Sequence, residues 1–203
     1  MSTIAISYPL ALPTSPVPVS TDINLDYAVG IATAPHSFAA QTQDWQGRMW
    51  RARVTLPAML RATADSWLVF FSLLRGQKGS FLMGDWDRRT ARGTIAGTVL
   101  VKGASQTGNG VAVDGATPST TLLKGDHIQI ENRLYRVCAD LTFDGSGEGT
   151  IQVEPDLRSA PADNAVVTYS SPKGLWRLAQ NFVASPSDFN GVHTLAFDAI
   201  EYL

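Results

Sequence analysis

The residues that most often carry acid–base or metal chemistry are few and far apart in this sequence. The histidines are His36, His127 and His193, and no two of them have the spacing of a metal-binding pair. We expect His127, between Asp126 and Ile128 at the start of a strand, to be exposed. Nucleophile-elbow, phosphate-binding and paired zinc motifs are absent from the sequence. Catalysis by a histidine is therefore not expected.

Cys138 is the single cysteine of the chain, so an intrachain disulfide is excluded and no zinc cluster can form from thiolates. It lies in the apolar run Val137-Cys138-Ala139. This setting predicts a buried thiol that packs in the core, because reactive thiols occupy electropositive and partly exposed sites.

One acidic segment partly matches a calcium-binding loop. Asp140, Thr142, Asp144 and Gly145 stand where such a loop has its first ligands and its glycine. The final position, which needs a bidentate glutamate, is Ile151. We therefore predict a glycine-rich turn between two strands here and no metal site.

The remaining carboxylates do not form a recognisable catalytic pattern. Asp85 and Asp87 stand beside Arg88 and Arg89, which is typical of a solvated loop. A glycosidase-like pair of distant carboxylates is left open by the sequence, but nothing favours it. We expect no catalytic residue, no metal and no cofactor, and hence a protein that is not an enzyme.

Charge and hydropathy narrow the possible functions further. Charged residues make up 17% of the 203 residues, below the roughly 25% of ordinary soluble domains. Partners that cover part of the surface would explain this, although a β protein rich in Gly, Ser and Thr gives the same value. The net charge is -2, which argues against specific binding to nucleic acid.

Neither a membrane anchor nor a secretion signal is expected. The sequence has no run of about 20 apolar residues, and its N-terminus lacks the basic start of a signal peptide. We expect no membrane insertion and synthesis in a cytoplasm.

Residues 1–20 are predicted to form an extended arm. Pro9, Pro13, Pro16 and Pro18 prevent a helix and remove hydrogen-bond donors that a regular sheet needs. Two interpretations remain open for this arm: a frayed terminus, or a segment that lies along a neighbouring subunit.

Two strands and a helix follow. Strands are predicted at 36–44 and 48–56, on either side of a turn at 44–47. In the second strand, one face is apolar and includes Trp50, Ala52, Val54 and Leu56.

The helix is predicted near 61–75. Its apolar stripe has the i, i+3, i+4, i+7 spacing and consists of Trp67, Phe70, Phe71 and Leu74. Gly76 is the expected left-handed residue that ends it. A helix this aromatic is expected to pack across a sheet.

The composition of the sequence changes after Arg92. Short strands with little helical signal are predicted near 97–102, 111–114, 127–131, 134–139, 149–154 and 165–169, which suggests a small barrel or sandwich. Alternating strands return between Leu175 and Glu201. We therefore predict a mainly β fold: a discontinuous β-sandwich-like main domain with one packed α-helix, 21–93 plus 172–203, interrupted by an inserted β domain over 94–171.

The stretch from Phe38 to Trp86 is similar to the distal tail proteins of long-tailed bacteriophages and of related gene transfer agents. The shared features are a polar hairpin, the strand with Trp50, the aromatic helix, Leu74-Arg75-Gly76-Gln77, Gly79-Ser-Phe81 and Gly84-Asp85-Trp86. The inserted segment, with its run Lys124-Gly-Asp126, also resembles β modules common in tail proteins.

This resemblance implies a structural protein of the virion tail, made in a bacterial host. Such proteins form hexameric rings between the tail tube protein and the baseplate hub protein, and DNA passes through the ring without specific binding. The alternatives are a carbohydrate- or receptor-binding module at the tail tip, formed by the insertion, and a neighbouring tail tube or terminator subunit. A tail-tip hydrolase is a further possibility, for which no residue can be named.

The candidate subunit interface consists of Trp45, Arg48, Arg51 and Arg53. Arg51 and Arg53 share the polar face of their strand, and arginine is enriched at interfaces. An ordinary solvated strand face explains the same residues equally well.

Overall fold

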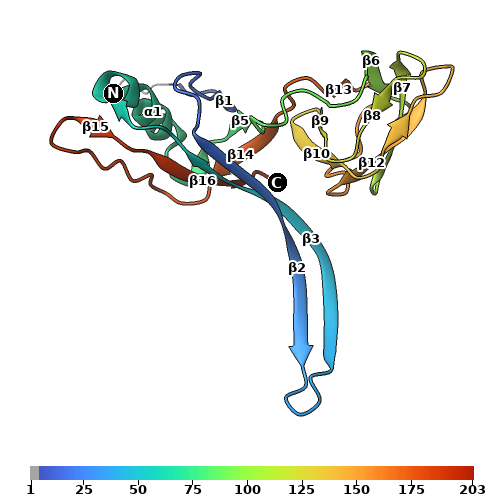
Figure 1. The fold of residues 1–203 in the computed structure, drawn as a ribbon, viewed down its shortest axis with the longest axis horizontal. Helices are drawn as coiled ribbons and strands as arrows, with labels where there is room; N and C mark the ends of the chain where they lie inside the picture. Colours follow the sequence, from blue (N-terminus) through green and yellow to red (C-terminus); the bar gives the residue numbers. More distant parts are fainter. Residues whose placement is uncertain (1–4) are drawn as a thin grey trace.

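The computed structural model describes residues 5–203, which fold around two separate hydrophobic cores. The first core belongs to the main unit, which contains the helix and both ends of the described chain. The second core belongs to an inserted unit, whose buried residues lie between Val99 and Val167. A long β-hairpin leaves the main unit and projects away from both cores (Figure 1). The expected mainly β fold with one packed helix is confirmed.

The main unit is built on a six-stranded sheet with the strand order β1-β5-β14-β16-β3-β2. β1 pairs with β5 in parallel, and the other neighbours are antiparallel. The strands are β1 (Leu10–Ala11), β2 (Ser20–Thr33), β3 (Ala40–Thr55), β5 (Phe81–Met83), β14 (Gly174–Leu178) and β16 (Ala196–Glu201). A short pair, β4 (Met59–Leu60) and β15 (Val192–His193), lies beside the helix.

The predicted alternation along β3 is confirmed. Trp50, Ala52 and Val54 are buried, whereas Arg51 and Arg53 are exposed on the opposite face. Successive side chains of a strand point to opposite faces, so one face of the sheet is apolar and the other polar.

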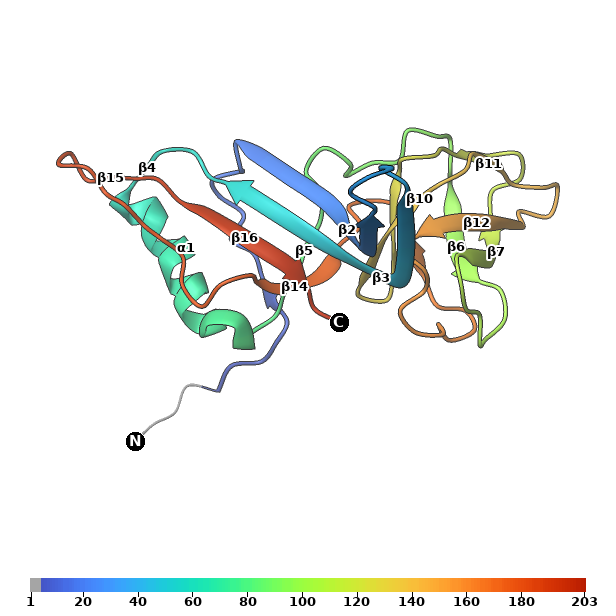
Figure 2. The ribbon, with the colours of Figure 1, turned by 90° about the horizontal axis from the view of Figure 1, so that it is seen from below.

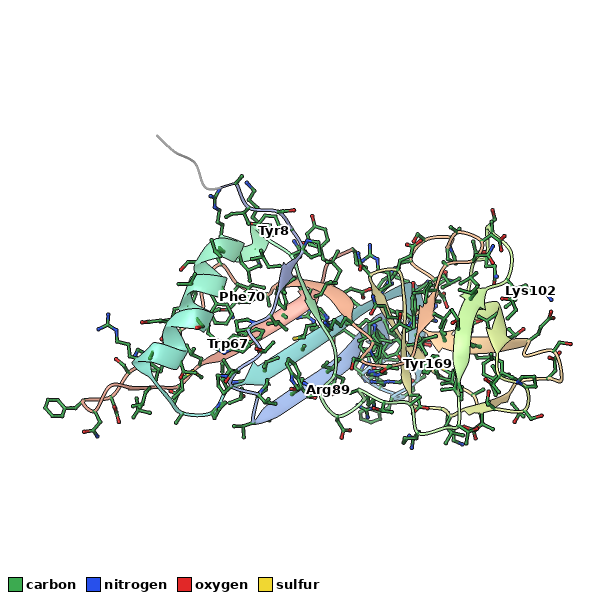
Figure 3. All side chains as sticks on the ribbon, turned by 90° about the horizontal axis from the view of Figure 1, so that it is seen from above. Tyr8, Trp67, Phe70, Arg89, Lys102 and Tyr169 are labelled. Carbon is green, nitrogen blue, oxygen red and sulfur yellow. The ribbon has the colours of Figure 1, made fainter. Side chains whose placement is uncertain are left out.

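Helix α1 (Arg61–Leu74) covers the apolar face of the sheet. Figure 2 shows it running alongside β16, with the inserted unit at the far end of the sheet. The predicted stripe is buried, and the Trp67 ring centroid lies 6.0 Å from that of Phe197 on β16. Trp67 and Phe70 are labelled in Figure 3. The helix ends one residue earlier than expected, because Arg75 with a φ of 53° is its left-handed cap; Gly76 opens the short 3-10 turn η1 (Gly76–Lys78).

The turn predicted at 44–47 is wrong. β3 runs without interruption through these residues and pairs with β2 over almost its whole length, and the chain reverses at residues 34–39 instead. The turn-forming residues make a bulge opposite Tyr27 and Val29. The carboxylate of Asp44 accepts the N–H of Gln46 at 2.7 Å, so this local hydrogen bond deforms the strand without ending it.

The arm is not a frayed terminus over residues 5–20, and its contact with a neighbouring subunit stays a prediction. Its first residues, 1–4, lie outside the described residues, but the rest packs on its own chain. β1 forms a short strand despite the neighbouring prolines, the Tyr8 hydroxyl donates to the carbonyl of Leu73, and Trp67 Nε1 donates to the carbonyl of Ser15. The arm thus passes from one edge of the sheet to the other.

The inserted unit is a nearly closed barrel. Its sheet has the order β13-β9-β10-β12-β7-β6, and a bridge between Leu100 and Val166 brings the first and last strands together. The strands are β6 (Gly97–Val101), β7 (Gly110–Ala116), β9 (His127–Ile130), β10 (Arg133–Val137), β12 (Gly149–Glu154) and β13 (Val167–Thr168), with the small pair β8 (Thr121–Leu122) and β11 (Leu141–Thr142). The six strands of this sheet were predicted from the sequence, and the short pair of β8 and β11 was not.

Trp67→Ala tests the packing of the helix on the sheet. We expect a loss of about 3–5 kcal/mol in the free energy of unfolding, because the indole is fully buried among Phe70, Phe71 and Phe197. Urea unfolding followed by circular dichroism measures this loss. Val69→Ala, on the exposed face of the same helix, is the control and should change stability by no more than about 0.5 kcal/mol. Equal effects of the two substitutions would contradict the assigned packing.

Candidate subunit interface

The four predicted interface residues do not form one surface. Trp45 lies exposed in the projecting hairpin, and Arg51 and Arg53 lie on the exposed polar face of the sheet. Arg48 is half-buried and turned toward the inserted unit. The structure therefore brings Arg51 and Arg53 together and separates them from the other two.

The polar face around Arg51 and Arg53 is electrically balanced. Arg51 pairs with Asp26 on β2, and Arg53 Nε lies 4.0 Å from Asp198 Oδ1 on β16. Asp22 is the register partner of Arg53 on β2. Exposed ion pairs of this kind add little to stability, but they give Arg51 and Arg53 each a neighbouring acid.

Arg48 was predicted as an exposed interface residue, but it is half-buried. Its guanidinium makes two ion pairs with the inserted unit, at 3.1 Å to Glu154 and 3.1 Å to Asp156. Arg48 sits at the base of the hairpin, opposite Tyr27. It therefore links the hairpin to the insertion within one chain.

A buried carboxylate forms the centre of the junction between the two units. Glu201, at the end of β16, receives Arg158 of the insertion in a bidentate pair, with distances of 3.0 and 2.6 Å. The same carboxylate accepts the N–H of Trp50 at 3.1 Å, and Arg158 also donates to the carbonyl of Arg48. Bidentate charge-assisted bonds are strong and directional. No sequence pattern predicts this pair, because its members belong to different units.

The expectation that His127 is exposed is wrong. Its side chain is fully buried at the junction, with its ring edge-on to Trp50 at 5.7 Å between centroids. Nε2 accepts from Arg136 at 3.4 Å, while Nδ1 has no hydrogen-bond partner and lies 4.0 Å from Asp85 Oδ2. Burial, and then the charge of Arg136, lower the pKa of His127 to about 4. The imidazole is therefore neutral at physiological pH.

Two further expectations need correction. Asp85 is buried, not solvated, and its carboxylate accepts from Arg88 at 2.6 Å and from the N–H of Asp87 at 3.0 Å. Cys138 is exposed, not buried, because it follows the inward-facing Val137 and turns outward. In both cases the neighbours along the sequence were a poor guide to the neighbours in space.

The segment that resembles a calcium loop forms the predicted turn. The N–H of Gly147 donates to the carbonyl of Asp144 at 3.0 Å, and the Asp144 side chain accepts from the N–H groups of Glu148 and Ser146. These backbone hydrogen bonds lower the pKa of Asp144. Over residues 5–203, no group of three or more His, Cys, Asp or Glu side chains is placed to hold a metal ion.

Of the outer hairpin, residues 27–47, only Trp45 was predicted as an interface residue, and the rest of this surface was missed. On β2, Ile23, Leu25, Tyr27, Val29 and Ile31 share one face. Ile23 is buried in the core, but the apolar stripe formed by Tyr27, Val29 and Ile31 is 58%, 45% and 67% exposed. β3 has its second neighbour, β16, only up to Arg51, so the outer hairpin lies beyond the sheet. The alternation over 21–33 is the signal that could have revealed it.

Trp45 occupies the opposite face of the outer hairpin. A Cβ atom on Gly30 would lie 2.4 Å from the end of the indole ring, so the ring rests directly on Gly30 and requires a glycine there. Phe38, near the tip, is also exposed. The outer hairpin thus presents apolar side chains on both faces. No helix among the described residues has the length and apolarity to cross a membrane.

His127 predicts a pH dependence of stability. Its pKa is lowered from 6.5 to about 4 on folding, so between these values the unfolded chain binds more protons than the folded one. The free energy of unfolding should therefore rise from about pH 4 to pH 6.5, and this contribution should be constant above that range. The full contribution is about 3 kcal/mol.

His127→Gln should remove this part of the pH dependence, measured as the difference between urea unfolding at acidic and at neutral pH. His36→Gln, at an exposed position, is the matched control. A His127→Gln variant with the pH profile of the parent would contradict the assignment.

A comparison with models of protein families finds no match for this sequence, and a search of the curated proteins finds no match either.

Proposed function

We propose that this chain is a distal tail subunit of a long-tailed bacteriophage or gene transfer agent. In this proposal six copies form a ring that joins the tail tube protein to the baseplate hub protein and continues the DNA channel. The observation that carries the proposal is the outer hairpin, which exposes an apolar stripe far from either core. The sequence resemblance between Phe38 and Trp86 supplies the kind of assembly.

The outer hairpin is poorly suited to stand alone in water. An isolated two-stranded hairpin is marginally stable, and exposed strands with apolar side chains promote association. Within residues 27–47, every residue except Gly30 is exposed. A neighbouring subunit that covered the apolar stripe would remove this surface from water. A contact in which each subunit covers the outer hairpin of the next can be repeated around a ring.

The balanced polar face suits the wall of a DNA channel. A protein that held DNA would need free cations to replace the counterions of the phosphates. Here Arg51 and Arg53 each have an acidic neighbour, Asp26 and Asp198. DNA could therefore slide along this face without being retained.

The insertion offers less support for a carbohydrate-binding role. Sugar sites generally present exposed aromatic rings. The insertion contains three aromatic residues. Tyr135 and Phe143 are buried, and the Tyr169 hydroxyl donates to the carbonyl of Gly97. A glycan array with the full chain tests this alternative. A tail tube or terminator subunit is the other alternative, and it would bind tube protein but not the hub.

Ring formation is tested on the purified full chain by light scattering after size exclusion and by negative-stain electron microscopy. We expect hexameric rings that bind both the tail tube and the hub protein. The triple variant Tyr27→Ser, Val29→Ser, Ile31→Ser should stay monomeric and keep its circular dichroism spectrum, because these side chains contribute little to the folded core. Val166→Ser, at an exposed position of the insertion, is the control and should form rings.

A parent chain that stays monomeric and binds neither tube nor hub protein would overturn the proposed function. Rings formed normally by the triple variant would show that another surface joins the subunits.

A further inference from the structure

A groove opens between the arm and the end of β5 in the main unit. It has a volume of about 510 Å³. One wall is the arm, with Pro9, Pro13 and Val17, and the other includes Trp86, Arg89 and Lys173. We call it the proline groove. Val17 is 56% exposed, so apolar surface is open to solvent here too. Arg89, one of the residues that line the groove, is labelled in Figure 3.

The outer hairpin and the proline groove are separate surfaces of one chain. The hairpin extends the edge strand β2, whereas the groove is lined by the arm as far as Pro18, by β1 and β5, and by the segments that follow β5 and precede β14. No residue of the outer hairpin lines the groove of its own chain, so the groove is open to another copy. A contact between the two surfaces on different copies is a head-to-tail contact, in which two different patches meet, and such contacts generate closed rings when the rotation permits.

The two surfaces have complementary chemistry. Asp44 is the only Asp, Glu, Lys or Arg in the outer hairpin. It stands directly opposite Val29 in the ladder, so it shares the face of the apolar stripe. The groove combines apolar walls with the exposed cations Arg89 and Lys173. Asp85, which also lines it, is already paired with Arg88.

The dimensions also agree. A cavity of about 150 Å³ accommodates one benzene ring. A groove of about 510 Å³ therefore has room for about three groups of that size. The apolar stripe offers three side chains: Tyr27, Val29 and Ile31.

We infer that the apolar stripe of one copy occupies the proline groove of the next copy, with Asp44 facing Arg89 and Lys173. This inference rests on the proposed ring and names the surfaces that join its subunits. The ring then buries both exposed apolar surfaces with one repeated contact.

Charge exchange tests the contact without disturbing either core. Asp44→Lys alone should abolish rings, because it places a cation beside Arg89 and Lys173. The double variant Arg89→Glu, Lys173→Glu should abolish them as well. Combining all three substitutions should restore rings, which a merely structural role of these residues would not produce. Lys124→Glu, an exposed charge reversal in the insertion, is the control and should leave ring formation unchanged.

Disulfide trapping locates the contact directly. With Cys138→Ser as background, the pair Ile31→Cys and Val17→Cys should give covalent multimers up to the hexamer under mild oxidation. The pair Ile31→Cys and Val166→Cys should not.

Two outcomes would overturn the inference, and they can be distinguished. If the parent chain forms rings, but the charge variants also form them and trapping fails, then the proline groove is not the receptor while the proposed function stands. If the parent chain stays monomeric and binds neither tube nor hub protein, the proposed function fails and the inference fails with it.

Discussion

The long hairpin leaves the main sheet where the pairing of β3 with β16 ends. The buried carboxylate of Glu201 lies at this position. β16 accompanies β3 only as far as the pairing of Ile200 with Arg51. At the next position the side chain of Glu201 accepts the N–H of Trp50, in place of a backbone carbonyl of a longer strand. The bidentate pair with Arg158 neutralises this carboxylate where it is almost fully buried. Removing one partner of a buried pair leaves an uncompensated charge, which costs about 3–5 kcal/mol.

The same junction sets the orientation of the hairpin. Arg158 comes from the insertion, and Arg48, at the hairpin's base, is held by Glu154 and Asp156 of the insertion. The inserted unit therefore supports the hairpin from the side at which β16 no longer does. A hairpin held in this way loses less conformational entropy on binding a neighbouring subunit than a flexible hairpin would. In the proposed ring, the insertion thus contributes to assembly even where it touches no partner.

Local sequence patterns were informative where a single element decides the outcome. The spacing of Trp67, Phe70 and Leu74 located the buried stripe of the helix, and the alternation around Trp50 identified the inward face of β3. Patterns were misleading where distant residues decide. The residues around Asp44 have the composition of a turn, but pairing with β2 across the whole hairpin makes them a bulge.

The candidate surfaces depended even more on distant contacts. His127 is buried because Trp50 of the main unit covers it. Arg48 is held in an ion pair because Glu154 of the insertion lies beside it. Alternation along β2 marks an apolar face, but it cannot tell which of Ile23, Leu25 and Ile31 the fold covers. That depends on where β16 ends, which only the assembled sheet reveals.

The position of Asp44 bears on why such a hairpin would join a ring and not a symmetric pair. Two apolar stripes packed against each other would bring two Asp44 carboxylates into one desolvated interface, and like charges brought together there disfavour the contact. In the proposed contact, the proline groove instead presents two cations to one carboxylate. A single acid on the apolar face thus leaves the stripe attractive to a groove on the next copy and unattractive to a second stripe. Because the groove and the stripe are different surfaces of one chain, a pair joined by the proposed contact still has one free surface of each kind, and only a closed ring uses them all.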